Sequence, residues 1–337
     1  MRLLRVNDLN FGEVPSHGPF PDYAILSHTW IHPSRDEVTY QDIILEESSA
    51  SKKKSGGSRK KPGWQKIQYT INQARKDNID YIWIDTCCIN KRDPTELTEA
   101  INCMYGWYKR SKRCYVYLSD VDFADKDTDE LEARLRPSQW FTRGWTLQEL
   151  IAPREVEFFD QNWVKITTRA DSSTVISAIT RIDAKLLMLM RRVGLNDLQE
   201  YSIAHRMSWA AEPRTTRGED VAYSLLGLFG VIMPLHYGEH RAFMRLQEEI
   251  VKISTDQSLF AWNGKDGKSR PRSVFFTILR LQVWQQECPL LRGVDILPLV
   301  TVFDPENNPM DSNDFPRDVL AAKMGAAVVL VLAPSLQ

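Results

Sequence analysis

Four short apolar runs alternate with helical patterns in the first half of the chain, and this alternation constrains the fold more than any other feature. The runs are Tyr23–Ser27, Tyr81–Asp85, Cys114–Leu118 and Glu155–Phe159. Strands that alternate with helices pair in parallel, because each crossover helix returns the chain to the same end of the sheet. The sequence therefore predicts an α/β fold over residues 1–165, in which these four strands form a parallel sheet flanked by helices.

The segments between these runs carry helix and loop signals. Asp93 is placed to cap a helix whose first residue is Pro94, and Glu96 follows three residues after the cap. A second helix is expected over residues 138–151, ended by Pro153. Residues 48–63 are rich in Ser, Lys and Gly and cannot bury much apolar area, so they predict a mobile loop.

The second half of the chain has a different pattern. Residues 166–262 predict a mostly helical region with one short strand at Ser258–Trp262, and residues 263–337 form a divergent segment whose fold the pattern does not indicate. The expected helices cover residues 172–179, 184–191, 203–211, 219–229 and 239–254.

Composition narrows the class of protein. A formal net charge of −1 argues against nucleic-acid binding, and the basic residues between Lys52 and Lys61 are better explained as a solvated loop than as a nuclear-localisation or phosphate-binding segment. The longest apolar stretch is too short to span a membrane, and the N-terminus lacks the apolar core of a signal peptide. Five cysteines, with Cys87 and Cys88 adjacent in an apolar run, indicate free buried thiols in a reducing compartment such as the cytoplasm. No zinc motif is present, so we expect no metal site.

The first candidate site follows the first predicted strand. Ser27, His28 and Trp30 lie at its carboxyl end, where parallel α/β sheets bind ligands. Hydroxyl, imidazole and indole groups there suit an aromatic ligand that forms hydrogen bonds. The alternative is that Trp30 fills the core and His28 is structural, and the residues alone favour neither interpretation.

The second candidate site follows the next strand. Asp85 and Asn90 could bind ribose hydroxyls or orient a loop, although both residue types also cap backbone amides in turns. Cys87 and Cys88 lie between them and have no obvious activating neighbour before Lys91, so we expect inert thiols.

The third candidate lies within the predicted helix over residues 138–151. Trp145 and Glu149 are four residues apart and share one helix face. An indole and Leu150 nearby would desolvate the Glu149 carboxyl and raise its pKa, which suits acid–base or charge-stabilising chemistry. The alternative is a solvated glutamate paired with Arg143 or Arg154, which spacing alone favours.

No dinucleotide-binding, P-loop or nucleophile-elbow motif is present. Instead, three segments resemble the signature blocks of the HET (heterokaryon incompatibility) domain of filamentous fungi, and three later segments continue the resemblance over residues 1–262. The segments are Tyr23–Trp30, Tyr81–Asn90, Arg143–Glu149, Asp220–Gly230, Pro234–Glu239 and Phe243–Ile250. The resemblance implies non-self recognition and regulated cell death in the cytoplasm. It also implies self-association and a partner of the NACHT, NOD-like or another incompatibility class.

HET domains are similar in turn to TIR (Toll/interleukin-1 receptor) domains, which implies a TIR-like, flavodoxin-like sheet. Some TIR domains cleave NAD with a glutamate in a W-x-x-x-E pattern, which Trp145–Glu149 matches. Under this resemblance Glu149 is catalytic, NAD is the substrate, no cofactor is needed, and the substrate-binding residues are Ser27, His28, Trp30, Asp85, Asn90, Arg143 and Trp145. The alternative function is a non-enzymatic, self-assembling module that triggers cell death by recruitment, with a structural Glu149.

Overall fold

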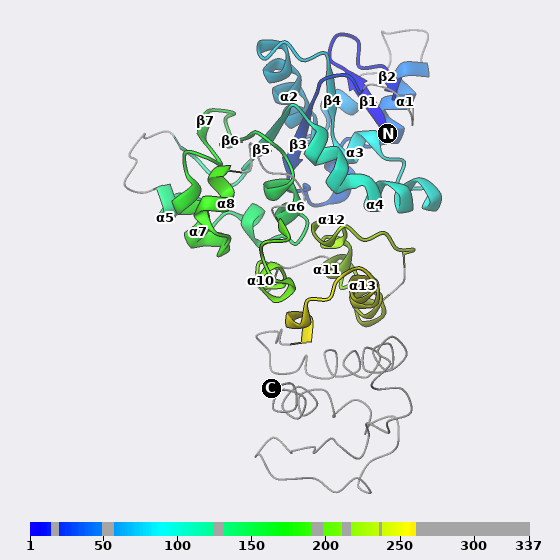
Figure 1. Cartoon of the computed structure of the whole chain (residues 1–337). Coiled ribbons are helices and arrows are strands. Elements are labelled where there is room, and N and C mark those ends of the chain that lie inside the picture. Colours follow the sequence, from blue (N-terminus) through cyan, green and yellow to red (C-terminus); the bar gives the residue numbers. More distant parts are fainter. Residues whose placement is uncertain are drawn as a thin grey trace, which may run out of the picture.

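The computed structural model describes residues 1–14, 20–48, 57–123, 131–189, 198–210, 217–235 and 238–260. Its centre is a seven-stranded sheet in the order β2-β1-β4-β3-β5-β6-β7 (Figure 1). The strands are β1 (Arg2–Arg5), β2 (Phe11–Glu13), β3 (Tyr23–His28), β4 (Tyr81–Trp83), β5 (Arg113–Tyr117), β6 (Val156–Phe159) and β7 (Lys165–Thr168).

The four central strands confirm the predicted parallel sheet. In the register, Ile25 of β3 lies opposite Trp83 of β4 and Cys114 of β5, and Cys114 lies opposite Val156 of β6. All six residues of β3 are buried, as expected for a strand covered on both faces.

The sequence did not predict the edge strands, which are antiparallel. β1 pairs with both β2 and β4, and β7 pairs with β6. These strands have only three or four residues each, and β1 and β7 begin with Arg2 and Lys165, so their apolar signal is weak. The sheet is therefore mixed, with a parallel centre.

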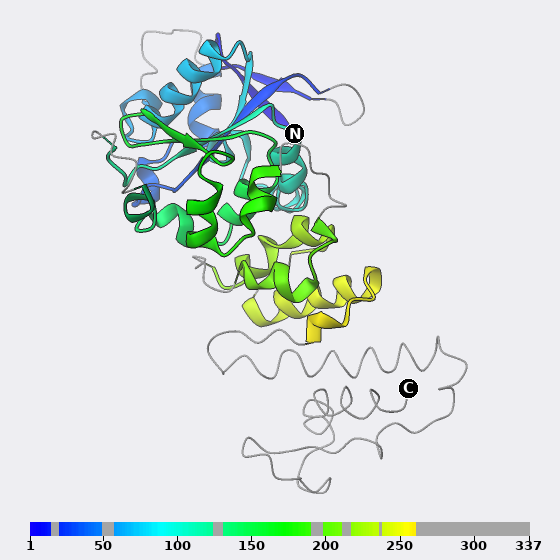
Figure 2. The same cartoon turned by 60° about the vertical axis from the view of Figure 1, so that its left-hand side comes forward.

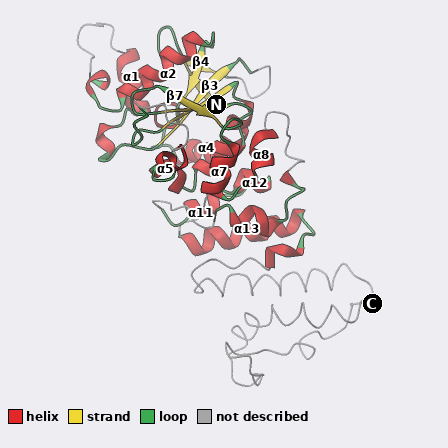
Figure 3. Ribbon diagram, turned by 90° about the vertical axis from the view of Figure 1, so that its left-hand side faces the viewer, coloured by secondary structure: helices red, strands yellow, loops and turns green. Residues whose placement is uncertain are grey.

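Helices cover both faces of the sheet (Figures 1 and 3). On one face, Tyr69 of α2 lies 6.1 Å from Tyr117 of β5, and on the other, Trp107 of α4 lies 5.5 Å from Trp83 of β4, between ring centroids. The helices of this part are α1 (Tyr40–Ser48), α2 (Trp64–Lys76), α3 (Asp85–Cys88), α4 (Pro94–Arg110), α5 (Leu131–Leu135) and α6 (Thr146–Ile151), with 3-10 turns η1 (Ser34–Asp36), η2 (Ser58–Lys60) and η4 (Gln139–Thr142).

The predicted start of α4 is confirmed in detail. The Asp93 side chain accepts hydrogen bonds from the backbone N–H groups of Thr95 and Glu96, and Pro94 is the first helical residue. The cap satisfies two amides that the helix itself leaves without partners.

Three expectations for secondary structure are wrong. The single helix over 138–151 is two elements, η4 and α6, because Arg143 adopts an extended conformation between them with φ −90° and ψ 138°. Asp85 does not end a strand but begins the one-turn helix α3. The expected strand at 258–262 is a 3-10 turn, η5 (Gln257–Phe260), as far as the described residues extend.

The loop at 48–63 is only partly within the described residues, since residues 49–56 lie outside them. Its second part is packed. Ser58 is buried, and Lys61 Nζ donates hydrogen bonds to Asp42 at 2.7 Å and to the Glu37 carbonyl at 2.9 Å. Residues 57–63 are therefore packed on the fold, whereas the mobility of the loop stays a prediction.

The second half is helical, as predicted, and its last helices extend away from the sheet (Figure 2). The helices are α7 (Ser173–Thr180), α8 (Ala184–Leu189), α10 (Ile203–Ser208), α11 (Asp220–Tyr223), α12 (Leu226–Phe229) and α13 (Glu239–Ile253). The expected helix over 219–229 is divided into α11 and α12. α12 packs on α4, and Asn102 of α4 holds the chain after α12 through hydrogen bonds to the N–H and carbonyl of Met233. The expected segment at 263–337 lies outside the described residues.

Candidate functional site

Ser27 and Glu149 meet at the carboxyl end of the central strands. The Ser27 hydroxyl, at the end of β3, donates a hydrogen bond to a carboxylate oxygen of Glu149 on α6. The Ser27 oxygen accepts a hydrogen bond from the indole N–H of Trp140 at 2.7 Å. Ser27 and Trp140 are fully buried and Glu149 is 8% exposed, so the carboxyl is enclosed in the protein.

The pKa of Glu149 is raised to about 7. Burial is the main cause, because a carboxylate loses its hydration in the interior, and the nearby charge of Asp85 acts in the same direction. Arg143 and the hydrogen bond from Ser27 favour the ionised form and oppose the shift. Glu149 therefore exchanges a proton near neutral pH. The alternative of a solvated surface glutamate is wrong.

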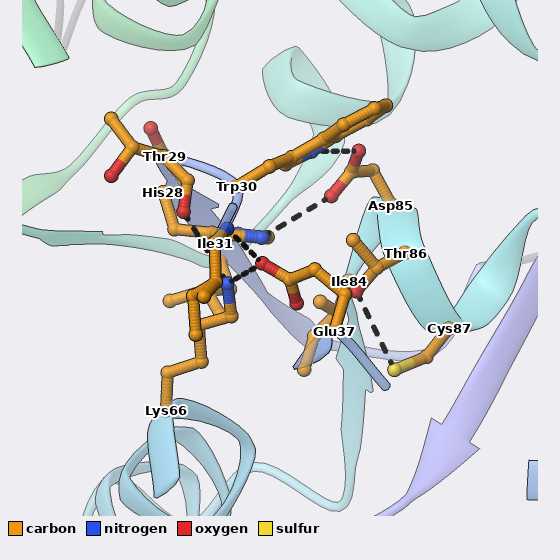
Figure 4. Close-up of polar contacts among 12 residues, drawn as sticks. His28, Thr29, Trp30, Ile31, Glu37, Lys66, Ile84, Asp85, Thr86 and Cys87 are labelled. Atoms are coloured by element: carbon orange, nitrogen blue, oxygen red, sulfur yellow. Dashed lines mark hydrogen bonds and ion pairs between the residues drawn. The ribbon is translucent and has the colours of Figure 1, made fainter. Parts of the chain in front are cut away.

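His28, Trp30 and Asp85 form a second group (Figure 4). The Trp30 indole N–H donates to Asp85 Oδ2 at 2.9 Å, and His28 Nε2 lies 3.7 Å from Asp85 Oδ1, too far for a hydrogen bond. Trp30 is 40% exposed, so it does not fill the core.

Burial and neighbouring charges determine the ionisation states of Asp85 and His28. Burial disfavours ionisation of Asp85, but the positive charges of Lys91 and Arg143 outweigh that effect and hold the pKa of Asp85 below its ordinary value. Burial, together with the positive charge of Lys66, lowers the pKa of His28 well below its ordinary value. At neutral pH, Asp85 is therefore a carboxylate and His28 a neutral imidazole.

The two groups lie on opposite faces of the sheet because consecutive strand residues alternate in direction. Ser27 points toward α6, whereas His28 is influenced by Lys66 of α2. Arg143 joins the two groups, since its Nη1 donates to the His28 carbonyl at 2.8 Å and its charge acts on both Asp85 and Glu149. Five predicted residues other than Asn90 and Trp145 thus lie in two adjoining groups at one edge of the sheet, joined by Arg143: Ser27, His28, Trp30, Asp85 and Glu149.

Asn90 and Trp145 serve other contacts. The Asn90 side chain accepts hydrogen bonds from Gln41 Nε2 at 2.8 Å and from the backbone N–H of Arg92 at 3.2 Å, as in a turn. Trp145 precedes α6, and its side chain is hydrogen-bonded to Asp220 of α11. Neither side chain makes a described hydrogen bond to Ser27, Asp85 or Glu149.

A buried ion pair that sequence reasoning missed lies below His28 (Figure 4). Lys66 Nζ donates to Glu37, and both side chains are almost fully buried. Lys66 also donates to the Thr29 carbonyl at 3.3 Å, and Glu37 accepts from the Ile31 N–H at 2.6 Å, so the pair holds the chain on both sides of Trp30.

The spacing of residues in α2 could have indicated one member of this ion pair. Lys66 lies eight residues before Ala74, which places it on the same apolar face of α2 as Ile67. The spacing of apolar residues could therefore have predicted that this lysine is buried. Its partner Glu37 follows a 3-10 turn and gave no such signal.

Three of the described cysteines lie in the interior, as expected for Cys87 and Cys88. Cys87, Cys88 and Cys114 are buried, and burial raises the pKa of each thiol above its ordinary value. A thiol that does not ionise is neither a nucleophile nor a metal ligand.

Within the described residues no cluster of His, Cys, Asp and Glu could hold a metal ion. No described helix combines the length and apolar character needed to cross a membrane.

One small cavity adjoins the Ser27–Glu149 group. It has a volume of ≈ 50 Å³, and its lining includes Trp140, Arg143 and Thr146. Pockets for small-molecule ligands usually have volumes of about 300–1,000 Å³, so this cavity is too small to enclose a dinucleotide.

Two family models match parts of the chain. The family model "Heterokaryon incompatibility protein (HET)" matches residues 23–134, and "Domain of unknown function (DUF8212)" matches residues 241–294, across the expected boundary at 263. No solved structure is similar enough to count as a match, so the TIR-like core remains a prediction.

One curated relative is the "Vegetative incompatibility protein HET-E-1" of Podospora anserina. It is 43% identical over 263 residues, which cover 75% of this chain but only 18% of the relative. The chain therefore spans less than a fifth of that protein's length. The family model spans the segments that build the sheet edge around Ser27 and Asp85, and together with the 43% identity over 75% of the chain it shows that the chain is a HET domain protein.

Proposed function

We propose that the chain acts in fungal non-self recognition as a cytoplasmic cell-death effector that hydrolyses NAD. The incompatibility role is supported by the similarity to a vegetative incompatibility protein. The NAD chemistry rests on the resemblance of Trp145–Glu149 to the TIR pattern. Self-association and a partner of the incompatibility class belong to the same proposal.

The observation that carries the chemistry is the environment of Glu149. Its carboxyl is enclosed, has a pKa of about 7, and lies at the edge of the sheet where α/β proteins bind ligands. A preorganised charge in a water-excluded site acts strongly on a developing charge, because little solvent screens it.

Hydrolysis of NAD breaks the bond between the nicotinamide nitrogen and ribose. The bonding electrons leave with nicotinamide, positive charge develops on the ribose, and water then adds and loses a proton. The carboxylate of Glu149 would stabilise this charge, while Ser27 orients the carboxylate and Arg143 favours its ionised form. No second carboxylate or metal is required by this scheme.

A second candidate function is the non-enzymatic assembly module. The closed environment of Glu149 and the small cavity near it favour this alternative. Under it, the hydrogen bonds among Trp140, Ser27 and Glu149 simply join α6 and η4 to the sheet.

Expression in a fungal host tests the proposal. Three proteins are compared at equal abundance: wild type, Glu149→Gln, and Glu132→Gln as a control with an exposed carboxylate. We expect wild type and Glu132→Gln to deplete cellular NAD and kill, and Glu149→Gln to do neither. Killing without NAD loss by all three would favour the assembly module and reject hydrolysis.

A further inference from the structure

We propose that Trp30, Lys91 and Arg143 form a recognition site for the phosphate-bearing part of a nucleotide, with Lys91 as the residue that selects phosphorylated ligands. The proposal rests on the proposed NAD hydrolysis for its choice of substrate class. It adds Lys91, which the sequence did not indicate as a site residue, and it assigns the exposed edge of the second group to binding rather than to bond cleavage.

The first observation is an exposed but immobilised indole. Trp30 keeps 40% of its surface in water, and its ring is fixed at one edge by the hydrogen bond to Asp85. The chain on both sides of Trp30 is held by the buried Lys66–Glu37 pair through Thr29 and Ile31. A rigid aromatic surface of this kind suits stacking of a base, because little side-chain freedom is lost on binding.

The second observation is a pair of positively charged side chains at the ring. Lys91 Nζ lies 3.6 Å from the centroid of the Trp30 ring, and the guanidinium carbon of Arg143 lies 5.8 Å from it. Asp85 lies 3.2 Å from Lys91 Nζ, whereas the charge of Arg143 also acts on Glu149 and Asp220. Two cations beside one exposed ring offer an anionic ligand two positive partners.

Both cations retain donors for a ligand. Among the described residues, Lys91 Nζ makes one hydrogen bond, to Asp85 at 3.2 Å, whereas an ammonium has three N–H groups. Arg143 makes one, through Nη1 to the His28 carbonyl, whereas a guanidinium has five. Phosphate oxygens are suited to both groups, since each accepts several charged hydrogen bonds.

The third observation is a buried imidazole nitrogen without a partner. His28 is 3% exposed, and within the described part of the chain its Nε2 has no hydrogen-bond partner. It faces Asp85 and the indole edge (Figure 4). Buried polar atoms normally form hydrogen bonds, so this nitrogen indicates a site completed by a bound group such as a ribose hydroxyl.

The test is binding of ADP-ribose and of adenosine to the full chain, measured by titration calorimetry. Adenosine offers the base and ribose without phosphate, so the ratio of the two affinities reports the phosphate contribution. We expect ADP-ribose to bind about 10- to 100-fold more tightly, and this preference to weaken as salt is added. Equal affinities, or no binding of either ligand, would overturn the proposal.

Lys91 is tested with two variants and one control. Lys91→Gln keeps a donor for Asp85 but removes the charge, and should weaken ADP-ribose binding about tenfold while leaving adenosine binding unchanged. Lys91→Arg should restore most of the affinity. The control is Lys112→Gln, which removes a half-exposed lysine paired with Asp22 beside the opposite end of β3 and should change neither affinity.

Two results separate this proposal from the proposed function. If ADP-ribose binds with the expected dependence on Lys91 but NAD yields no nicotinamide, the recognition site stands and hydrolysis is rejected. If Lys91→Gln binds both ligands like wild type and melts at the same temperature, Lys91 does not select phosphate and the inference is wrong.

Discussion

Ser27 and Glu149 are 122 residues apart in the chain, yet the serine hydroxyl donates a hydrogen bond directly to the glutamate carboxylate. This bond joins the end of β3 to α6 and holds the titratable carboxyl of Glu149 in the interior, at the carboxyl end of the central strands. Because Trp140 donates to the same serine oxygen, the three side chains form one continuous chain of hydrogen bonds.

Replacing Ser27 with Ala should break this chain at its centre. The Trp140 N–H and the Glu149 carboxyl would both lose a buried partner, which should lower the free energy of unfolding by about 1–3 kcal/mol. The pKa of Glu149 should rise further, because the Ser27 hydrogen bond favours the carboxylate. Denaturant unfolding measures the first effect. Ser119→Ala, which removes an exposed hydroxyl, is the control, and an equal loss in both variants would contradict the account.

Glu149→Gln should change the pH dependence of stability. The pKa of Glu149 rises from 4.5 when unfolded to about 7 when folded, so the folded state binds the extra proton between these values. Stability therefore falls as pH rises through this window, by about 3 kcal/mol in total, and is not affected by this group below pH 4.5. The variant lacks this titration, so its stability relative to wild type should increase from pH 4.5 to pH 8.

Asp85→Asn should behave in the opposite sense. The pKa of Asp85 is lower in the folded protein than in the unfolded chain. The charge of Asp85 therefore stabilises the fold at pH values above the unfolded pKa, and this stabilisation is lost as the pH falls below about 4. The variant should be destabilised at neutral pH and approach wild type in acid. If both variants showed the same pH trend, at least one of the two charge assignments would be wrong.

The Lys66–Glu37 pair should show strong coupling. Lys66→Met leaves Glu37 buried without its partner and should cost about 3–5 kcal/mol, whereas the double variant with Glu37→Leu should recover most of that loss. Lys252→Met, which breaks an exposed pair with Glu249, should cost no more than about 0.5 kcal/mol. A double-mutant cycle by chemical denaturation measures the coupling, and additive losses would show that the pair is not energetically linked.

Gly227→Ala tests how closely α12 approaches α4. A Cβ at Gly227 would lie 2.0 Å from the Cβ of Tyr105, so the two helices must separate to admit it. We expect a loss of about 1–3 kcal/mol or more, seen as a lower melting temperature. Gly57→Ala is the matched control, since nothing lies within 4 Å of its added Cβ. An unchanged melting temperature for Gly227→Ala would mean that α12 does not pack on Tyr105.

The sequence predicted the parts of this structure that depend on local pattern. The four central strands and the capped start of α4 follow from apolar runs and from Asp93 and Pro94. The break at Arg143 was not predictable, because a residue that can continue a helix is held extended while its side chain reaches the His28 carbonyl.

The site was predictable only in outline. Parallel topology brought Ser27 and Asp85 to one edge, as expected. Which partners Ser27 would meet depended on residues far away in the chain, namely Trp140 and Glu149. Spacing within one helix could not indicate that Glu149 would be buried against a serine from a strand.

The most direct test of the central claim is the rate at which the purified protein releases nicotinamide from NAD at pH 8, measured for wild type and for Glu149→Gln. The assay uses high protein concentration with a crowding agent, and a melting curve confirms that the variant is folded. We predict that wild type releases nicotinamide and that the folded variant is about 10²–10³-fold slower, the usual effect of removing one preorganised electrostatic group. A folded variant that releases nicotinamide as fast as wild type would contradict the role of Glu149.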